Sequence, residues 1–398
     1  MDAKVKEAVA HAYNNSPAFR KRMNRAGLSP ADINGIDDLS KIPVLKKDTL
    51  ISLQAKKPPF GGLLAADFSC VARVFMSPGP IFDPQGEKED YWRLREALEA
   101  AGFRRGDIVV NTFSYHLTPA GFMLDSGLRA LGAVVIPTGV GKAEQQLRAI
   151  NHLGVTGYVG TPTLLRDILR KAEEKGHAPG SLSLKKAFVS AEVLSELLRR
   201  EFEEEWGVVT RQGYGTEDLG IVAYECHEKN GMHVSSGMIV EICNPHTGKP
   251  LREGEIGEVV VTLFNPLYPL IRFGTGDLSV LSSKPCPCGR TTPRLLRIAG
   301  RIGSSVKVRG IFLHAQQINE LISQFPAIKE VQCVITREEH RDVLTMRLGT
   351  QEAMSPEEIE GFLKKAKEIM KVKVDLLEFL PPDALKGKPL FDDQRVWD

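Results

Sequence analysis

The sequence predicts an α/β protein in which a large N-terminal α/β domain with mixed sheets precedes a small C-terminal α+β lobe. Between residues 90 and 215, amphipathic helical stretches alternate with short apolar strands, as in sheets that helices cover on both faces. After Met238 the pattern changes to antiparallel strands joined by glycine turns. A chain of 398 residues exceeds the usual size of a single core. We therefore expect domains at 1–301 and 302–398.

The composition excludes several classes of protein. Hydrophobic residues make up 42% of the chain, charged residues 26%, and the net charge is +2, so neither a nucleic acid nor an anionic membrane is expected as partner. No apolar run approaches the ~20 residues of a membrane span. The six cysteines are too sparse for a disulfide scaffold. We expect a cytoplasmic protein.

The first 60 residues predict two helices that meet at Ser16-Pro17 and a further helix that starts at Ser29-Pro30. We interpret them as a wrapper without chemistry of its own. Residues 74–86 predict a short strand and a rigid surface turn rich in proline and glycine. Such a loop could present backbone N–H groups to a phosphate, but proline removes the donor that this requires.

The alternating region predicts a ligand site, because ligands of such sheets bind beyond the carboxyl ends of the strands. Five strand ends are expected to meet at one edge. They comprise residues 113–116, 137–141, 160–162, 190–192 and 213–218.

The stretch from Ile271 to Gly310 connects the two predicted parts. It predicts an apolar strand, a glycine turn that presents Asp277, a Cys-Pro-Cys-Gly turn and a glycine-rich joint. We expect a site where the two parts meet. The C-terminal lobe is predicted to contain a helix at 316–324, strands at 331–336, 343–348 and 372–379, and a helix with a capping box that begins at Ser355.

Four residues predict a structural metal site. Cys286 and Cys288 flank one proline, and Cys226 precedes His233 by seven positions. Three thiolates and an imidazole suit tetrahedral zinc, with His227 as the alternative to His233. The other reading is a set of reduced side chains in a turn-rich region. The remaining cysteines are expected in the core: Cys70, Cys243 and Cys333.

The order of motifs resembles the phenylacetate–CoA ligase branch of the adenylate-forming enzymes, from about residue 10 to the C-terminus. The motifs are Y-G-T-E-D-L-G, G-E-I-G-E-V-V-V-T, P-L-I-R-F-G-T-G-D-L, C-P-C-G-R-T and G-R-I-G-S-S-V-K-V-R-G. The resemblance implies an enzyme that uses ATP and Mg²⁺ to convert a carboxylic acid into an acyl-adenylate. Coenzyme A then displaces AMP to give a thioester, after the small lobe has rotated.

The resemblance also assigns the nucleotide site. Asp277 matches the acid that binds the ribose hydroxyls, and Tyr214 matches the ring that stacks on adenine. Gly215 and Thr216 match residues that touch phosphate, and Ser190-Ala191-Glu192 matches a loop beside adenine in which Ala191 replaces a glycine. The magnesium acid is Asp218 or Glu217, and the motif spacing favours Asp218.

Further residues follow from the hinge and the C-terminus. Arg301 matches a hinge-side arginine that reaches the nucleotide, and Gly303 stands where the family often has the hinge aspartate. Lys388 matches the catalytic lysine that bridges carboxylate and α-phosphate, with Lys386 as the alternative. The loop that moves in for thioester formation matches Lys307, Arg309 and Gly310.

The acyl pocket implied by the resemblance has an aromatic lining that suits an aromatic acid, although it would also admit aliphatic acids. His116 is expected to form structural hydrogen bonds. The expected lining comprises Phe113, Tyr115, His116, Gly121, Thr138 and Gly139.

One departure from the family motivates two alternatives. A Ser77-Pro78-Gly79-Pro80 loop replaces the usual Ser/Thr/Gly-rich phosphate loop, which removes donors for pyrophosphate. The chain could therefore bind nucleotide or acyl group without turnover, or transfer the adenylate to an acceptor other than coenzyme A. The sequence leaves the oligomeric state open, a homodimer included.

Overall fold

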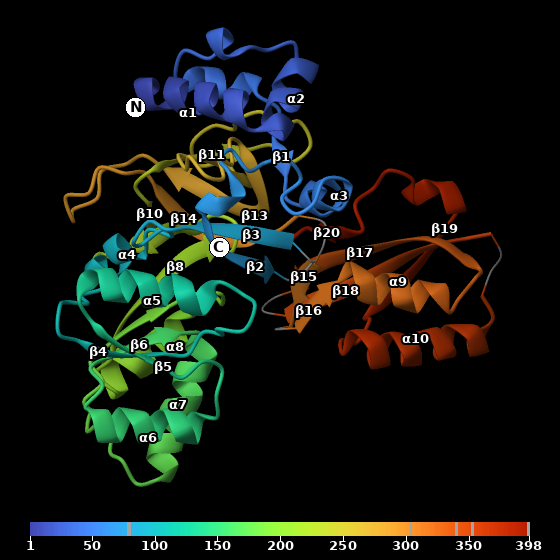
Figure 1. Ribbon diagram of the computed structural model, residues 1–398. Coiled ribbons are helices and arrows are strands. Elements are labelled where there is room, and N and C mark those ends of the chain that lie inside the picture. Colours follow the sequence, from blue (N-terminus) through green and yellow to red (C-terminus); the bar gives the residue numbers. More distant parts are fainter. Residues whose placement is uncertain (78–80, 303–304, 310, 339–340, 352–353, 396–398) are drawn as a thin grey trace. The chain divides into compact units, whose positions relative to one another are not determined.

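The protein forms two compact units, the larger from residues 1–275 and 279–298 and the smaller from residues 276–278 and 299–398. The computed structural model describes residues 1–77, 81–302, 305–309, 311–338, 341–351 and 354–395 (Figure 1). The larger unit is α/β with an extended mixed sheet, and the smaller is α+β, which confirms the predicted fold class. The boundary between residues 301 and 302 stays a prediction.

Helices α1 (Asp2–Asn15) and α2 (Pro17–Arg25) begin the larger unit. Ser16 ends the first and caps the second: its hydroxyl accepts a hydrogen bond from the Phe19 N–H at 3.4 Å. Proline fits the first position of α2, where its missing N–H is not needed. Their apolar faces pack together in a small core. This pair of helices was predicted.

The helix that we predict at Ser29-Pro30 is wrong, because the structure forms only a single 3₁₀ turn, η1 (Pro30–Asp32). The Asp32 carboxylate accepts hydrogen bonds from the N–H and the hydroxyl of Ser29, both at 2.8 Å. The start signal is therefore present. Asn34 and Gly35 follow at once and favour a turn, so no second helical turn forms.

A short strand joins this N-terminal segment to the main sheet. Strand β1 (Leu45–Lys46) pairs in parallel with strand β13 (Phe273–Ser282), and helix α3 (Thr49–Lys56) follows it. This pairing brings Lys46 and Lys47 to the sheet.

The segment from 74 to 86 is a β-hairpin instead of the strand and surface turn that we predicted. Strand β2 (Val71–Ser77) pairs with strand β3 (Ile81–Gly86), and Phe75 lies opposite Asp83. The predicted turn at Pro78-Gly79-Pro80 lies outside the described residues. A hairpin of two strands tolerates proline where its missing N–H is not required by the ladder, which is how Pro84 fits β3.

Parallel strands form one half of the main sheet, in the order β8-β7-β6-β4-β5. Their bounds are Ile108–Asn111 for β4, Val134–Pro137 for β5, Gly157–Gly160 for β6, Lys186–Val189 for β7 and Val209–Thr216 for β8. The helices are α4 (Leu94–Ala100), α5 (Ala120–Leu131), α6 (Ala143–Leu153), α7 (Pro162–Glu174) and α8 (Glu196–Arg200).

Helices cover both faces of these strands, as predicted (Figure 1). On one face Val109 and Phe188 pack with α4 and α5. On the other face Val110 and Val189 pack with α6 and α7. Adjacent strand residues thus point to opposite cores, which explains why the strands are apolar throughout.

The other half of the sheet is largely antiparallel, in the order β11-β12-β13-β14-β10-β9-β8. Strand β8 joins the halves because residues 209–212 pair in parallel with β7 and residues 213–216 pair antiparallel with β9. The remaining bounds are Gly220–Glu225 for β9, Met232–Val234 for β10, Met238–Cys243 for β11, Gly257–Leu263 for β12 and Arg294–Arg301 for β14.

Within its described residues, the smaller unit contains a four-stranded sheet in the order β19-β18-β17-β20, a two-stranded β15-β16 ladder and two α-helices. The bounds are β15 (Ser305–Val308), β16 (Ile311–His314), α9 (Ala315–Ser323), β17 (Ile328–Glu338), β18 (Arg341–Thr350), α10 (Pro356–Met370), β19 (Leu376–Leu380) and β20 (Phe391–Asp393). The capping box between Ser355 and Glu358 is confirmed. Strand β19 begins four residues later than predicted. No helix of the described ranges is long and apolar enough to cross a bilayer.

Two of the three cysteines expected in the core are there. Cys243 and Cys333 are buried in strands. The expectation for Cys70 is wrong, because its side chain is exposed at the end of a 3₁₀ turn, η3 (Phe68–Cys70). Asp67 caps this turn and accepts a hydrogen bond from the Ser69 N–H, which delays the start of β2 until Val71.

Candidate functional site

The loop after β7 is fixed against the end of β8. The Ser190 hydroxyl donates a hydrogen bond to the Gly213 carbonyl at 2.8 Å, which places the loop beside the residue that precedes Tyr214. The Glu192 carboxylate accepts hydrogen bonds from the N–H and the hydroxyl of Thr163, at 3.2 and 2.6 Å. Both ends of the predicted adenine loop are thus held by protein contacts.

Ala191, between them, adopts a left-handed backbone conformation with φ +68°. This conformation costs a residue with a Cβ atom roughly 1 kcal/mol, whereas glycine adopts it freely. The backbone conformation therefore favours glycine, which is the residue that the resemblance implies at this position. The chain keeps the loop conformation despite the substitution.

Tyr214 is anchored by the neighbouring strands. Its hydroxyl donates a hydrogen bond to Thr275 Oγ1 at 3.2 Å, and the Thr275 hydroxyl donates to the Val259 carbonyl at 3.1 Å. Gly215 is needed for a close approach, since a Cβ atom at this position would lie 2.6 Å from the Gly220 carbonyl oxygen. The Thr216 hydroxyl accepts a hydrogen bond from the Leu219 N–H at 3.2 Å, which shapes the turn that carries the acids.

Asp277 follows Thr275 by two residues in β13, and it forms an ion pair with Arg301. Arg301 Nε lies 2.8 Å from Asp277 Oδ1. Asp277 is buried, whereas nearly half of the Arg301 side chain is exposed. The structure thus brings together the predicted ribose acid and the predicted nucleotide arginine, and the arginine is accessible to a ligand.

One further carboxyl group, Asp83, and one ammonium group, Lys47, lie near the predicted magnesium acids Asp218 and Glu217. Lys47 Nζ is 2.6 Å from Asp218 Oδ2, and the Asp218 side chain is fully buried. Neither oxygen of Asp83 forms a hydrogen bond with a described residue. Burial, followed by the charge of Asp218, raises the pKa of Asp83 well above its usual value, while Lys47 opposes this shift. Burial also raises the pKa of Glu217.

Sequence reasoning missed Lys47 and Asp83. Lys47 comes from the segment that we interpreted as a wrapper, 171 residues away from Asp218. The available signal was the Lys-Lys-Asp run after a short apolar stretch, which does not tell which distant acid it meets. Asp83 lies in the proline-rich segment that we interpreted as a surface turn.

We expect Lys47→Met to destabilise the larger unit by about 3 kcal/mol, because it leaves the buried Asp218 carboxylate without its cation. Denaturant unfolding with a probe for the larger unit would measure the loss. Lys41→Met is the matched control, since its partner Asp38 belongs to a surface pair and little change is expected. Equal stability of wild type and Lys47→Met would contradict a buried ion pair.

The predicted mobile-loop residues and the predicted catalytic lysine lie in the smaller unit, whereas Thr216 and Asp218, which are also predicted to be catalytic, lie in the larger unit. Arg309 contacts the Asp375 carboxylate and donates to the Lys373 carbonyl at 2.7 Å, so its side chain is held within the unit. Gly303, Gly310 and the side chain of Lys307 lie outside the described residues. Lys388 is exposed between η5 (Pro382–Leu385) and β20, and so is its alternative, Lys386.

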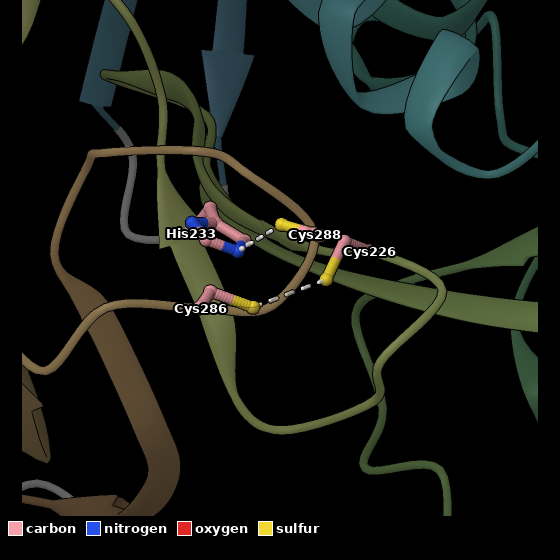
Figure 2. A group of neighbouring side chains, drawn as sticks. All are labelled: Cys226, His233, Cys286 and Cys288. Atoms are coloured by element: carbon pink, nitrogen blue, oxygen red, sulfur yellow. Dashed lines mark hydrogen bonds between the residues drawn. The ribbon is translucent and has the colours of Figure 1, made fainter.

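Four metal-ligating side chains converge beside β10 (Figure 2). Their ligand atoms all lie within 4.8 Å of one another: Cys226, His233, Cys286 and Cys288. The sulfur atoms of Cys226 and Cys286 are 3.8 Å apart, and Cys288 Sγ lies 3.3 Å from His233 Nε2. With Zn–S bonds of about 2.3 Å, two sulfur ligands of a tetrahedral zinc would be about 3.8 Å apart.

The surroundings of His233 prepare its Nε2 atom to act as a ligand. Nδ1 lies 3.3 Å from the Thr292 carbonyl oxygen, which can only accept a hydrogen bond. In the tautomer that donates this bond from Nδ1, the lone pair of Nε2 faces Cys288. Burial lowers the pKa of His233 and thereby favours the neutral ring. Although burial opposes it, hydrogen bonds from Arg290 lower the pKa of Cys288 to about 7. His227, the alternative ligand, is exposed and contacts Glu228.

A pocket of about 460 Å³ lies at the ends of β4 and β5, next to α5. Of the predicted acyl-pocket residues, Tyr115, His116, Thr138 and Gly139 line it. Phe113 is packed in the core instead. Gly121 serves packing, because a Cβ atom there would lie 2.5 Å from the Ser114 carbonyl oxygen. Asp125, which lines the pocket from α5, was not predicted, because no motif of the sequence marks it.

Comparison with known proteins agrees with these observations. Residues 91–263 match the family described as AMP-binding enzyme. The chain is 32% identical to the phenylacetate-coenzyme A ligase of Thermus thermophilus over 88% of this chain and 81% of that protein. It is 31% identical to the phenylacetate-coenzyme A ligase of Aromatoleum evansii, over 87% and 80%.

Solved structures support the same fold. A 2-hydroxyisobutyryl-CoA ligase, solved with 2-HIB-AMP and CoA, superposes with a TM-score of 0.74 over 99% of this chain and 88% of that chain, at 23% identity. At that identity the match shows the fold. The matches to the two phenylacetate-coenzyme A ligases cover most of both chains at more than 30% identity. The chain therefore belongs to the phenylacetate–coenzyme A ligase family.

Proposed function

We propose that the protein is an AMP-forming carboxylate–CoA ligase that activates an aromatic, phenylacetate-like acid. The carrying observation is the identity of 32% to a phenylacetate-coenzyme A ligase over most of both chains. The paired Asp277 and Arg301, and the anchored Tyr214, support the proposal at the residues that we predict to bind nucleotide.

The first half-reaction forms an acyl-adenylate. A carboxylate oxygen of the acid attacks the α-phosphorus of ATP, and pyrophosphate leaves. In the proposal Tyr214 stacks on adenine, Asp277 accepts hydrogen bonds from the ribose hydroxyls, and Lys388 stabilises the negative charge that builds up between carboxylate and α-phosphate. The second half-reaction transfers the acyl group to the thiol of coenzyme A. The thiol loses its proton, and AMP leaves with the former carboxylate oxygen.

Magnesium belongs to the proposal, and the acids fit it. Asp218 Oδ1 and Glu217 Oε2 are buried oxygens without a hydrogen bond to a described residue, and hard oxygen ligands suit this ion. Asp218 would hold it together with phosphate oxygens, and Glu217 is the alternative. When bound, the ion neutralises charge on the triphosphate. Lys47 already contacts the other oxygen of Asp218 and keeps this carboxylate in place.

We also propose that the chain works as two domains, 1–301 and 302–398, which pivot near Gly303 between the half-reactions. Thioester formation would then use Lys307, Arg309 and Gly310. Small residues at a hinge absorb changes of φ and ψ with little strain. We propose that the protein works in the cytoplasm, without a nucleic acid or a membrane as partner. The proposed assembly is a homodimer, which light scattering would test.

A structural zinc ion is the third part of the proposal. The convergence of Cys226, His233, Cys286 and Cys288 supports it, because their ligand atoms lie within 4.8 Å of one another and soft sulfur and imidazole ligands suit zinc. A closed set of four ligands would tie the loop after β9 to the loop after β13. It would contribute stability and no step of the reaction.

Asp277→Ala is expected to weaken ATP binding by about tenfold to a hundredfold, since each lost hydrogen bond from a ribose hydroxyl to a carboxylate accounts for about 1.5–3 kcal/mol. Calorimetry with ATP would measure the dissociation constant. Asp38→Ala is the matched control, because Asp38 belongs to an ion pair with Lys41 outside the predicted nucleotide site and its loss should leave ATP affinity unchanged. Equal ATP affinity of Asp277→Ala and wild type would contradict the assignment.

An assay with ATP, Mg²⁺, coenzyme A and a panel of acids tests the function as a whole. We expect pyrophosphate, AMP and an acyl-CoA thioester in equal amounts. One competing function is that of a non-catalytic homologue, which binds nucleotide or acyl group without turnover. A specific observation favours it: the Ser77-Pro78-Gly79-Pro80 loop lacks backbone donors at both prolines. Nucleotide binding without pyrophosphate from any acid would favour that non-catalytic homologue. Acyl-AMP without thioester would point to a different acceptor.

A further inference from the structure

The pocket beside β4 and β5 contains a carboxylate that a plain phenyl ring does not need. Asp125 lies on α5 and lines the pocket with 22% of its side chain exposed. Tyr115, Pro137 and Val140 supply the apolar part of the lining. A pocket of about 460 Å³ has the size for a substituted aromatic acid. The position of one acid among these residues suggests what the substituent is.

Two hydrogen bonds in the pocket wall form a chain that ends at Asp125 as the acceptor. The Asn111 amide nitrogen donates to the Tyr115 hydroxyl oxygen at 2.8 Å, and the Tyr115 hydroxyl donates to Asp125 Oδ2 at 3.3 Å. Burial and the Asp125 charge raise the pKa of Tyr115, so its hydroxyl keeps its proton. The direction of both bonds is therefore set, and Asp125 is the acceptor at the end of the chain.

Asp125 has accepting capacity left. A carboxylate offers about four lone-pair sites, and Tyr115 uses one of them. Arg129 Nη1 lies 3.9 Å from Asp125 Oδ1, beyond hydrogen-bonding distance, and the Arg129 side chain is 75% exposed. Such an exposed contact is easily given up to a ligand.

The hydroxyl group of Thr138 does not supply the pocket with a donor, because it donates to the Asn111 carbonyl at 3.1 Å. The Ser114 hydroxyl oxygen accepts from the His116 N–H at 3.1 Å. Asp125 is thus the charged acceptor of this lining, and it suits a ligand group that donates a hydrogen bond. A second carboxylate on the ligand would be repelled.

We propose that this pocket selects aromatic acids that carry a hydrogen-bond donor, a hydroxyl or amino group, on the ring, and that Asp125 accepts the hydrogen bond from that donor. The inference rests on the proposed function, in which the same pocket holds the acyl group. Tyr115 is a positioning residue, since it holds Asp125 through its hydroxyl. A site built to accept a hydrogen bond discriminates strongly against a ligand without the donor, because its acceptor is then left unpaired.

The test compares phenylacetate and its ring-fluorinated analogues, which have no donor, with hydroxy- and aminophenylacetates substituted at the same ring positions. Calorimetry measures binding of each acid to the full-length protein, and pyrophosphate release with ATP measures kcat/KM. We expect the best hydroxy or amino acid to bind at least about tenfold more tightly than its fluoro counterpart. Asp125→Leu should abolish this ratio and bind the fluoro acid at least as well as wild type does.

Two further variants separate recognition from damage to the fold. Asp167→Asn changes an exposed acid on α7 and should leave the ratio unchanged. Tyr115→Phe should reduce the ratio only in part, because Asp125 remains but loses its hydroxyl partner. A wild-type ratio near one, or the same ratio in Asp125→Leu, overturns the inference.

The same measurements distinguish a failure of this inference from a failure of the proposed function. Pyrophosphate release from all acids without a donor preference overturns the inference and leaves the ligase in place. A donor preference in calorimetry that depends on Asp125, without pyrophosphate from any acid, supports the inference and contradicts the ligase.

Discussion

Lys388→Ala is expected to lower the rate of acyl-adenylate formation by about 10²–10³-fold. A cation placed where negative charge builds up in the transition state contributes an effect of this size when it is removed. Pyrophosphate release in a single-turnover experiment with saturating ATP and acid would measure it. The rate of thioester formation from added acyl-AMP should change much less, since that step needs no cation between carboxylate and ATP.

Lys386→Ala is the matched control, because this second exposed lysine lies two residues away in the same loop. We expect it to retain the wild-type adenylation rate. The reverse result, a large loss in Lys386→Ala and none in Lys388→Ala, would exchange the two assignments. Normal adenylation in both single variants would contradict a lysine role at this loop.

Cys226→Ser should release zinc and lower the melting temperature of the larger unit by about 8 °C. A metal that is present at a thousandfold its dissociation constant stabilises the folded state by about 4 kcal/mol. At about 2 °C per kcal/mol for a unit of this size, that corresponds to the stated shift. Elemental analysis and calorimetric melting of the same preparations would give both numbers.

Cys70→Ser controls for the loss of a thiol, since Cys70 is exposed and lies outside the cluster. It should keep the metal and the melting temperature. Removal of metal from wild type with a chelator should reproduce the Cys226→Ser shift, and added zinc should reverse it. A wild-type protein that contains no zinc, with a melting temperature unaffected by either treatment, would contradict the site.

Periodicity was enough to predict most of the fold. Strand β4 is apolar at successive residues because Val109 and Val110 face opposite cores, whereas a strand with one face in water would alternate apolar and polar residues. Local signals gave wrong predictions where the residues that follow the signal determined the structure. The Ser29 cap is formed, but Asn34 and Gly35 stop the helix, and the prolines of the β2–β3 segment concealed a hairpin.

A site residue could be predicted from the sequence when it belonged to a recognisable motif. The four residues that could hold a metal ion were named from residue types and spacing, and the structure brings them together. Lys47, Asp83 and Asp125 were missed because their roles depend on distant partners or on a helix face. No local pattern tells that Lys47 meets Asp218 across 171 residues.

Transfer of oxygen from the acid to AMP tests the central claim most directly. The best substrate of the acid panel, labelled with ¹⁸O in its carboxylate, would be converted with ATP and coenzyme A, and the AMP analysed by mass spectrometry. We predict one ¹⁸O atom in the phosphoryl group of each AMP formed, because the carboxylate oxygen that attacks the α-phosphorus leaves with AMP. Unlabelled AMP, or ¹⁸O in inorganic phosphate together with ADP, would contradict the account.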